Sequence, residues 1–169
     1  MSGGRGGRWI NRITALPEFN IFLFGVLLNF VWELLQMPLF AESPDHSHYW
    51  TVTLMCGFAT IADGVILLIA FWVASGFARS RGWIMTGDRK PVLVFVLVGL
   101  AITCAIELLA TANGIWHYSD RMPQLFGIGL SPFFQWVFPP LITLWLTKRQ
   151  MAGIAALSGG TFSAKEGAR

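Results

Sequence analysis

Residues 19–40 read FNIFLFGVLLNFVWELLQMPLF, and this stretch decides the class of fold. Its length matches the roughly 20 mostly apolar residues that a helix needs to cross a bilayer. Its second half nevertheless carries three polar side chains, Asn29, Glu33 and Gln36. Their i, i+4, i+7 spacing places them on one stripe of a helix. The segment therefore predicts a membrane-spanning helix with a polar stripe that must be kept away from lipid.

The composition of the whole chain favours a polytopic membrane protein. Of its 169 residues, 54% are hydrophobic and only 12% are charged, and the mean hydropathy is +0.59. A soluble fold would have too little polar surface to cover such a core. The net charge of +3 does not indicate nucleic-acid binding, because the basic residues form short clusters between apolar runs, as in cytoplasmic loops. Cys56 and Cys104 lie within apolar runs and are predicted to be packing residues.

Four segments have the length and apolarity of membrane spans, or nearly so: 19–40, 50–77, 91–112 and 130–147. The last contains Pro139 and Pro140, which predict a kink. If both termini are cytoplasmic, all twelve Lys and Arg residues except Arg121 lie on the cytoplasmic side. We therefore expect an all-α integral protein of the cell membrane, a four-transmembrane-helix bundle with both termini cytoplasmic.

This topology divides the chain into three parts. A basic cytoplasmic N-terminal segment covers residues 1–18, a single transmembrane helical domain covers residues 19–149, and a cytoplasmic C-terminal tail covers residues 150–169. The N-terminal apolar run is predicted to be a retained anchor rather than a signal peptide, because it is long and contains Glu33.

Carboxyl groups within the predicted spans are the candidate catalytic residues: Glu33, Glu107 and Asp63. Placing a charged carboxylate at the bilayer centre costs roughly 2.5–3.5 kcal/mol, so these groups should face one another or a wet cavity. No Lys or Arg lies within a span to neutralise them, and an acid without a cation in low dielectric tends to keep its proton. A protonated acid can donate to a partner carboxylate or to a substrate. We expect a polar pocket between the helices, near the extracytoplasmic side.

Amide and aromatic side chains near these acids are the candidate substrate-binding residues: Asn29, Trp32, Gln36, Trp116, Tyr118, Gln135 and Trp136. Aromatic faces lining the pocket would stabilise a cationic intermediate. Two simpler interpretations stay open. Intramembrane amides often only join helix to helix, and most aromatic residues of membrane proteins pack in the core or in interfacial belts.

No metal or other cofactor is expected. His46, His48 and His117, with Asp45 and Asp120, offer ligand types that metals use, but a loop H-x-H pair without a third ligand at fixed spacing is a weak signal. What these histidines bind stays open. The sequence contains no phosphate-binding glycine loop, nucleophile elbow or H-E-x-x-H motif.

Two sequence patterns resemble known membrane enzymes. Asn29-x-x-Trp32-Glu33 resembles the N-x-x-W-E pattern of the integral-membrane terpene cyclases of fungal meroterpenoid pathways. Glu107, followed by GIWHY at 114–118 and by Ser131-Pro132, is similar to small carotenoid enzymes of the lycopene-cyclase-domain type. The resemblance implies that Glu33 is the essential acid. The chain departs from these families in having fewer spans and in carrying Phe134-Gln135 where an acidic pair is usual.

The leading hypothesis is an intramembrane enzyme that acts on a hydrophobic lipid or isoprenoid by carboxylate acid–base chemistry of the cyclase or isomerase type. Its partners would be membrane lipids and a hydrophobic small-molecule substrate. A small proton-coupled transporter, and a structural or assembly subunit of a larger membrane complex, are the alternatives. The sequence does not settle whether the chain is an enzyme, which substrate it takes, or whether it forms a homo-oligomer.

Overall fold

The computed structural model describes residues 13–40 and 49–166, and it describes the side chains of residues 13–40 and 50–157. The predictions for the basic segment before residue 13 lie outside the described residues, as do those for Asp45, His46 and His48. Short elements at the helix ends are η1 (Met37–Leu39), α4 (Trp83–Thr86), β1 (Gln124–Leu125) and β2 (Ile128–Gly129).

Three long helices lie where the first three spans are predicted. They are α2 (Pro17–Gln36), α3 (Tyr49–Ala78) and α5 (Arg89–Ala112). Each is long and apolar enough to cross a membrane. Their boundaries follow local signals in the sequence. Pro17 begins α2 at a position where its missing N–H costs no helical bond, and Asp88 caps α5 by accepting a hydrogen bond from the Lys90 amide.

The fourth predicted span is divided into two helices, α6 (Leu130–Gln135) and α7 (Phe138–Glu166). The interruption at Trp136 and Val137 lies just before the two prolines, which occupy the first turn of α7. Proline is tolerated there, but Pro139 and Pro140 have no N–H to donate to the carbonyls of Gln135 and Trp136. The chain therefore breaks the helix instead of bending it at the prolines. The predicted tail, 150–169, is helical as far as Glu166.

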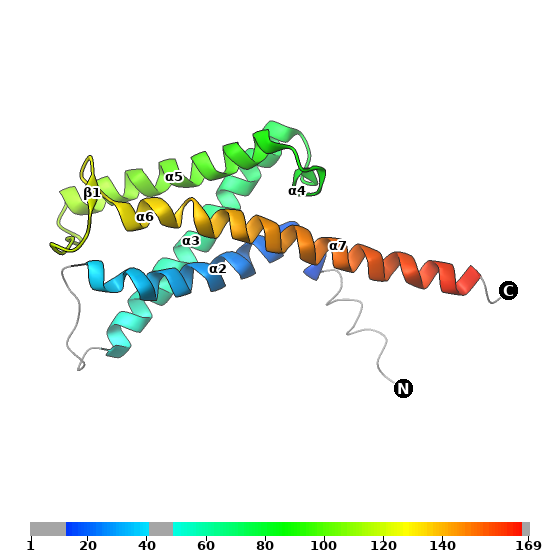
Figure 1. Ribbon diagram of the computed structural model, residues 1–169, viewed down its shortest axis with the longest axis horizontal. Helices are drawn as coiled ribbons and strands as arrows, with labels where there is room; N and C mark the ends of the chain where they lie inside the picture. The colour runs from blue at the N-terminus through cyan, green and yellow to red at the C-terminus, as the bar shows by residue number, and fades with distance from the viewer. Residues whose placement is uncertain (1–12, 41–48, 167–169) are drawn as a thin grey trace.

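The long helices form one bundle, and part of α7 projects beyond it (Figure 1). Helix α3 crosses the bundle obliquely and packs on both α2 and α5, and α7 packs on α2. Two glycines permit close approach between elements. A Cβ added at Gly25 would lie 2.3 Å from Leu67 Cδ1, and one added at Gly99 would lie 2.3 Å from the Trp136 ring. Small residues at helix contacts are typical of membrane bundles, where packing rather than the hydrophobic effect drives association.

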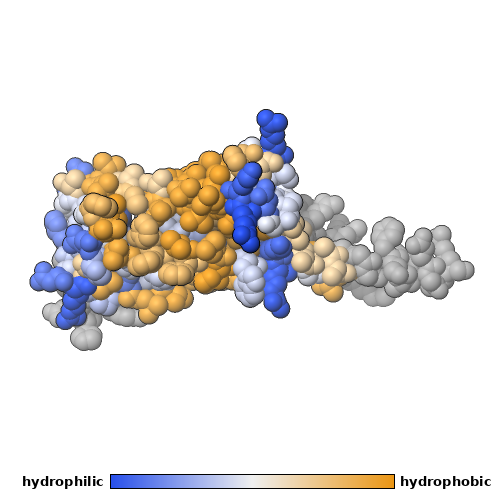
Figure 2. Space-filling view, turned by 45° about the horizontal axis from the view of Figure 1, so that its top comes forward, coloured by the Kyte–Doolittle hydropathy of each residue, from blue (hydrophilic) through white to orange (hydrophobic). Residues whose placement is uncertain are grey.

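The surface carries an apolar belt between two hydrophilic rims (Figure 2). Large apolar side chains of several helices are exposed on it, including Leu27, Phe58, Leu93 and Trp145. In water this surface would be costly, whereas in a bilayer it matches the hydrocarbon. The belt therefore supports a membrane protein on grounds independent of helix length.

We name the two ends of the bundle by the elements found there. The α4 end holds α4 and the starts of α2 and α5, and α7 projects beyond it (Figure 1). The hairpin end holds β1 and β2, the end of α2 and the start of α3. The hairpin turns through Phe126 and Gly127, both with positive φ, as a tight two-residue turn requires. All described basic residues except Arg121 lie toward the α4 end or on α7 beyond it.

Candidate functional site

Polar side chains from three helices meet around one amide group toward the hairpin end. We call them the amide–carboxyl cluster: Asn29, Glu33 and Gln36 of α2, Asp63 of α3, and Ser131 and Gln135 of α6. At its centre, Gln135 Nε2 lies 2.9 Å from Glu33 Oε1, 2.9 Å from Asp63 Oδ2 and 3.1 Å from Asn29 Oδ1. Glu33 and Asp63 therefore approach the same nitrogen from different helices.

The rest of the cluster is built on Gln36. Its Nε2 donates to Glu33 Oε1 at 2.9 Å and to Gln135 Oε1 at 3.1 Å. Its Oε1 accepts a hydrogen bond of 2.9 Å from Ser131 Oγ. Asn29, Gln36 and Gln135 are buried, with exposed fractions of 1%, 5% and 3%. The polar stripe predicted for residues 19–40 therefore faces inward, onto α3 and α6.

The hydrogen count at the centre of the cluster has a chemical consequence. A primary amide carries two N–H hydrogens, yet three oxygens lie within hydrogen-bond distance of Gln135 Nε2. Glu33 Oε1 also receives the Gln36 amide, so Glu33 is the better supplied of the two acids. A proton on the Asp63 carboxyl group would remove the shortage, because a carboxylic acid supplies its own O–H donor.

A second group surrounds Glu107 on α5. We call it the Glu107 cluster: Glu107, Trp116 and Tyr118. Glu107 Oε2 accepts from Trp116 Nε1 at 3.3 Å and from the Tyr118 hydroxyl. Burial, and then the hydrogen bond to Glu107, raise the pKa of Tyr118 above its ordinary value. Tyr118 therefore stays a protonated donor at neutral pH.

Contacts with the end of α2 hold Tyr118 in place. Ser119 donates to the Leu39 carbonyl through both its amide and its hydroxyl, each at 3.0 Å. The rings of Phe40 and Tyr118 lie 5.6 Å apart, and the two residues form an isolated β-bridge. Gly129 also packs closely against the Tyr118 ring, because a Cβ there would lie 3.1 Å from Tyr118 Cε1.

The two clusters are neighbours without a direct hydrogen bond between their described side chains. Glu107 lies within electrostatic range of Glu33 and Asp63. The sequence predicts that all three acids gather in one group. In the structure, Glu33 and Asp63 form a pair around Gln135, and Glu107 lies apart from them with its own hydrogen-bond donors. Within the described parts of the chain, no Lys or Arg side chain hydrogen-bonds to any of the three.

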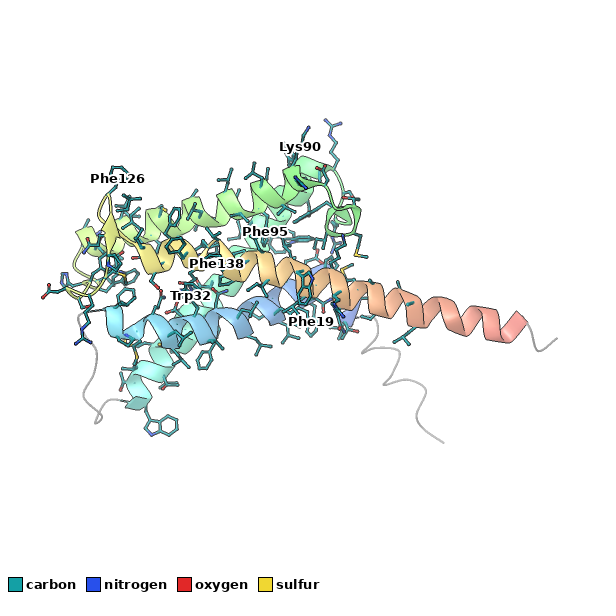
Figure 3. All side chains as sticks on the ribbon, viewed as in Figure 1. Phe19, Trp32, Lys90, Phe95, Phe126 and Phe138 are labelled. Carbon is teal, nitrogen blue, oxygen red and sulfur yellow. The ribbon has the colours of Figure 1, made fainter. Side chains whose placement is uncertain are left out.

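Four buried hydrogen-bond donors on residues close in sequence to the cluster residues have no partner among the described residues. They are the indole Nε1 atoms of Trp32 and Trp136 and the hydroxyls of Thr60 and Thr103. Trp32 and Trp136 adjoin Glu33 and Gln135 in sequence, while Thr60 and Thr103 precede Asp63 and Glu107 by about one helical turn. Figure 3 labels Trp32 on α2, which packs beside α7. An unsatisfied buried donor costs roughly 1–3 kcal/mol, so each of these groups would gain from an acceptor, as would the Thr143 and Thr147 hydroxyls of α7.

Trp136, predicted as a substrate-binding residue, has a packing role in the structure, which the sequence had left open as the simpler interpretation. It is 1% exposed and its ring covers Gly99, so it is part of the helix packing as well as a neighbour of the cluster. Ser131 was not predicted as a site residue, although its i, i+4 spacing to Gln135 places both on one face of α6.

The loop residues considered as metal ligands are not assembled in the described part of the chain. His117 and Asp120 are exposed. Within residues 13–40 and 49–166, no group of three or more His, Cys, Asp or Glu side chains is placed to hold a metal ion.

Comparison with known proteins found no matching family model, no similar curated protein and no similar solved structure. The resemblance of Asn29-x-x-Trp32-Glu33 to membrane terpene cyclases therefore stays a prediction.

Proposed function

We propose that the protein is an intramembrane enzyme that acts on a hydrophobic lipid or isoprenoid by acid–base chemistry, with Glu33 and Asp63 as the reacting pair. The observation that carries this proposal is the convergence of both carboxyl groups on Gln135 Nε2, each at 2.9 Å. Two carboxylates this close in a low-dielectric site do not both ionise readily, so the pair holds a proton between them. Such a pair supplies one acid and one base.

The proposed reaction is a proton-initiated rearrangement. The acid member of the pair protonates an alkene or epoxide of the substrate, a carbocation forms, and the base member removes a proton from a neighbouring carbon. The proton count balances, so the reaction is an isomerisation or cyclisation that needs no nucleotide. Trp32 adjoins Glu33 in sequence and Trp116 contacts Glu107, and their indole rings would stabilise the cation.

The unpartnered donors support a substrate that carries an oxygen atom. Trp32 Nε1, Thr60 Oγ1 and Thr103 Oγ1 can each donate to an epoxide, carbonyl or hydroxyl oxygen. Glu107 supports the same site from the side. Its carboxyl group accepts from Trp116 and Tyr118, and in its ionised form it would favour a cation between the clusters.

The test is product formation by membranes containing the full chain. A linear polyprene and its terminal epoxide are incubated with the membranes, and cyclised or isomerised products, which have the same mass as the substrate, are identified by chromatographic retention and by their fragmentation in mass spectrometry. Glu33→Gln and Asp63→Asn each remove one proton-exchanging group at nearly constant shape, and we expect a loss of activity of at least about 100-fold. Asp120→Asn, at an exposed position of the hairpin end, is the matched control and should retain activity. Full turnover by Glu33→Gln, with normal insertion, rules out Glu33 as a member of the pair.

The proposal includes a membrane topology with four crossings and both termini in the cytoplasm. The basic residues at the α4 end support this orientation, because Lys and Arg accumulate on the cytoplasmic side. The pair α6 and α7 would form the fourth crossing. Single cysteines placed at Gly82 and Gly127, in the chain with Cys56 and Cys104 replaced by alanine, test it. An impermeant thiol reagent added to intact cells should label the cysteine at 127 and leave the one at 82 unlabelled.

One observation favours a second candidate, a proton-coupled transporter. The interruption between α6 and α7 directly follows Gln135, and broken helices beside buried carboxyl groups are typical of transporter binding sites. Proteoliposomes with an internal pH dye distinguish the two. Substrate-driven proton movement without any change in the substrate would support transport, whereas conversion without proton movement supports the enzyme.

A further inference from the structure

A groove at the α4 end, far from both clusters, combines positive charge with apolar walls. It has a volume of about 230 Å³ and lies between α4, the start of α5 and the middle of α7. Residues from all three helices line it, among them Trp83, Arg89, Val92, Leu141, Trp145 and Lys148. We call it the interfacial groove. The proposed reaction does not use it.

Two basic side chains, those of Arg89 and Lys148, give the groove its positive charge. Arg89 belongs to the first turn of α5, and Lys148 reaches across from α7, so that a Cβ added at Gly87 would lie 3.9 Å from Lys148 Nζ. The acid in its lining is Asp88, whose carboxylate is engaged as the cap of α5 at 3.0 Å from the Lys90 amide. A further cation lies at the rim, where the Arg149 guanidinium sits 5.4 Å from the centre of the Trp145 ring.

The apolar walls connect the groove with the membrane-facing surface. Leu141 and Trp145 of the lining are 42% and 57% exposed. Figure 2 shows that the apolar belt ends at a hydrophilic rim on this side of the molecule. Tryptophan beside a cation is the usual composition at the level of lipid head groups. A ligand seated here would place an anion against Arg89 and Lys148 and hydrocarbon against Leu141.

We propose that the interfacial groove binds the phosphate head group of an anionic phospholipid, with its acyl chains lying along α7. The shared chemistry is a phosphate group. The lipid is favoured over a free phosphate ion because the groove opens along an apolar wall that phosphate alone would leave unused. Basic pockets between helices on the cytoplasmic side are suited to such head groups, because that leaflet is rich in anionic lipid.

Native mass spectrometry of the purified full-length protein in detergent tests this proposal. Phosphatidylglycerol and phosphatidylcholine are titrated separately, and inorganic phosphate is added in a third series. We expect phosphatidylglycerol to bind, and the double variant Arg89→Gln/Lys148→Gln to weaken its binding roughly tenfold or more, because two charges near the surface are lost. The matched control is Lys90→Gln/Arg79→Gln, which removes the same charge at the same end without touching the groove lining (Figure 3 labels Lys90).

Each remaining outcome contradicts a defined part of the proposal. Equal loss of phosphatidylglycerol binding in both double variants shows diffuse attraction and overturns the groove as a site. Binding of inorganic phosphate that depends on Arg89 and Lys148, without lipid binding, overturns the lipid as occupant. Thermal unfolding of the variants shows whether they fold, and the single variant Lys148→Gln, expected to weaken binding about fivefold, serves if the double variant does not.

Discussion

The amide–carboxyl cluster and the Glu107 cluster lie at the same end of one bundle but are held in different ways. The first is built from side chains one or two turns apart on regular helices, so helix geometry alone brings Asn29, Glu33 and Gln36 to one face. The second depends on a loop that is fixed by its contact with Leu39, about 80 residues earlier in the chain. The comparison shows that a buried acid can be positioned either by periodicity or by a long-range anchor, and that only periodicity is visible in the sequence.

The largest effect on stability is expected from removing the centre of the amide–carboxyl cluster. Gln135→Leu takes away the amide that contacts Asn29, Glu33 and Asp63. The contacted oxygens of Asn29 and Asp63 lose their described donor and Gln36 Nε2 loses the Gln135 oxygen, whereas Glu33 Oε1 keeps the Gln36 amide. At roughly 1–3 kcal/mol for each unsatisfied group, we expect a loss of at least about 3 kcal/mol in the free energy of unfolding. Chemical denaturation in detergent, followed by tryptophan fluorescence, measures it.

The control for this variant is Gln150→Leu, at an exposed position of α7. It makes the same change in composition and should alter the unfolding free energy by less than about 0.5 kcal/mol. Equal stability of Gln135→Leu and Gln150→Leu would mean that the cluster contributes no net stability and that its members serve only the chemistry.

A variant at Gly99 tests the contact between α5 and Trp136 without changing any residue of the amide–carboxyl cluster. Gly99→Ala would place a Cβ 2.3 Å from the ring of Trp136, which is 1% exposed and has no room to move. Overpacking of this kind costs typically 1–3 kcal/mol. We expect a lowered melting temperature and, because Trp136 adjoins Gln135, a loss of product formation.

Gly76→Ala is the matched control, because nothing lies within 4 Å of a Cβ at that position of α3. Alanine is the better helix former by up to about 1 kcal/mol, so this variant should be as stable as the wild type or more stable. A Gly99→Ala protein as stable as Gly76→Ala would contradict the close approach of α5 to Trp136.

The smallest effect is expected in the Glu107 cluster. Tyr118→Phe removes the hydroxyl that donates to Glu107 but leaves the Trp116 donor, so we expect a loss of about 1–2 kcal/mol at neutral pH. Because the pKa of Tyr118 is raised above its ordinary value of 10.0, the wild type keeps this contribution below about pH 10 and loses it as the pH rises further. The melting temperatures of wild type and variant should therefore converge at high pH. A constant difference between them would mean that the hydroxyl does not titrate with folding.

Much of the fold and part of the candidate site follow from the sequence. The apolar runs predict α2, α3 and α5, and the spacing of Asn29, Glu33 and Gln36 predicts an inward stripe. The prolines indicate a defect in the fourth span but not its position before them. What they do to the helix depends on which carbonyls lose a donor.

The remaining features depend on tertiary contacts that leave no local signal. The pairing of Tyr118 with Glu107 requires the anchor between Ser119 and Leu39. The hairpin turn places Phe126 at φ 53°, a conformation that phenylalanine rarely adopts. The residue types of this segment therefore do not predict a two-residue hairpin turn. The interfacial groove joins Arg89 and Lys148, which are far apart in the chain and become neighbours only when α7 packs beside α4.

The interruption at Trp136 and Val137 gives this bundle a joint. The backbone amides of Trp136 and Val137 donate to the carbonyls three residues back, those of Phe133 and Phe134. The two prolines that follow have no N–H, so they add no backbone hydrogen bond across the interruption. Swinging α6 against α7 would therefore sacrifice little backbone bonding. Ser131 and Gln135 both belong to α6. A rotation of that short helix would therefore separate their side chains from Glu33 and Asp63 without moving the long helices.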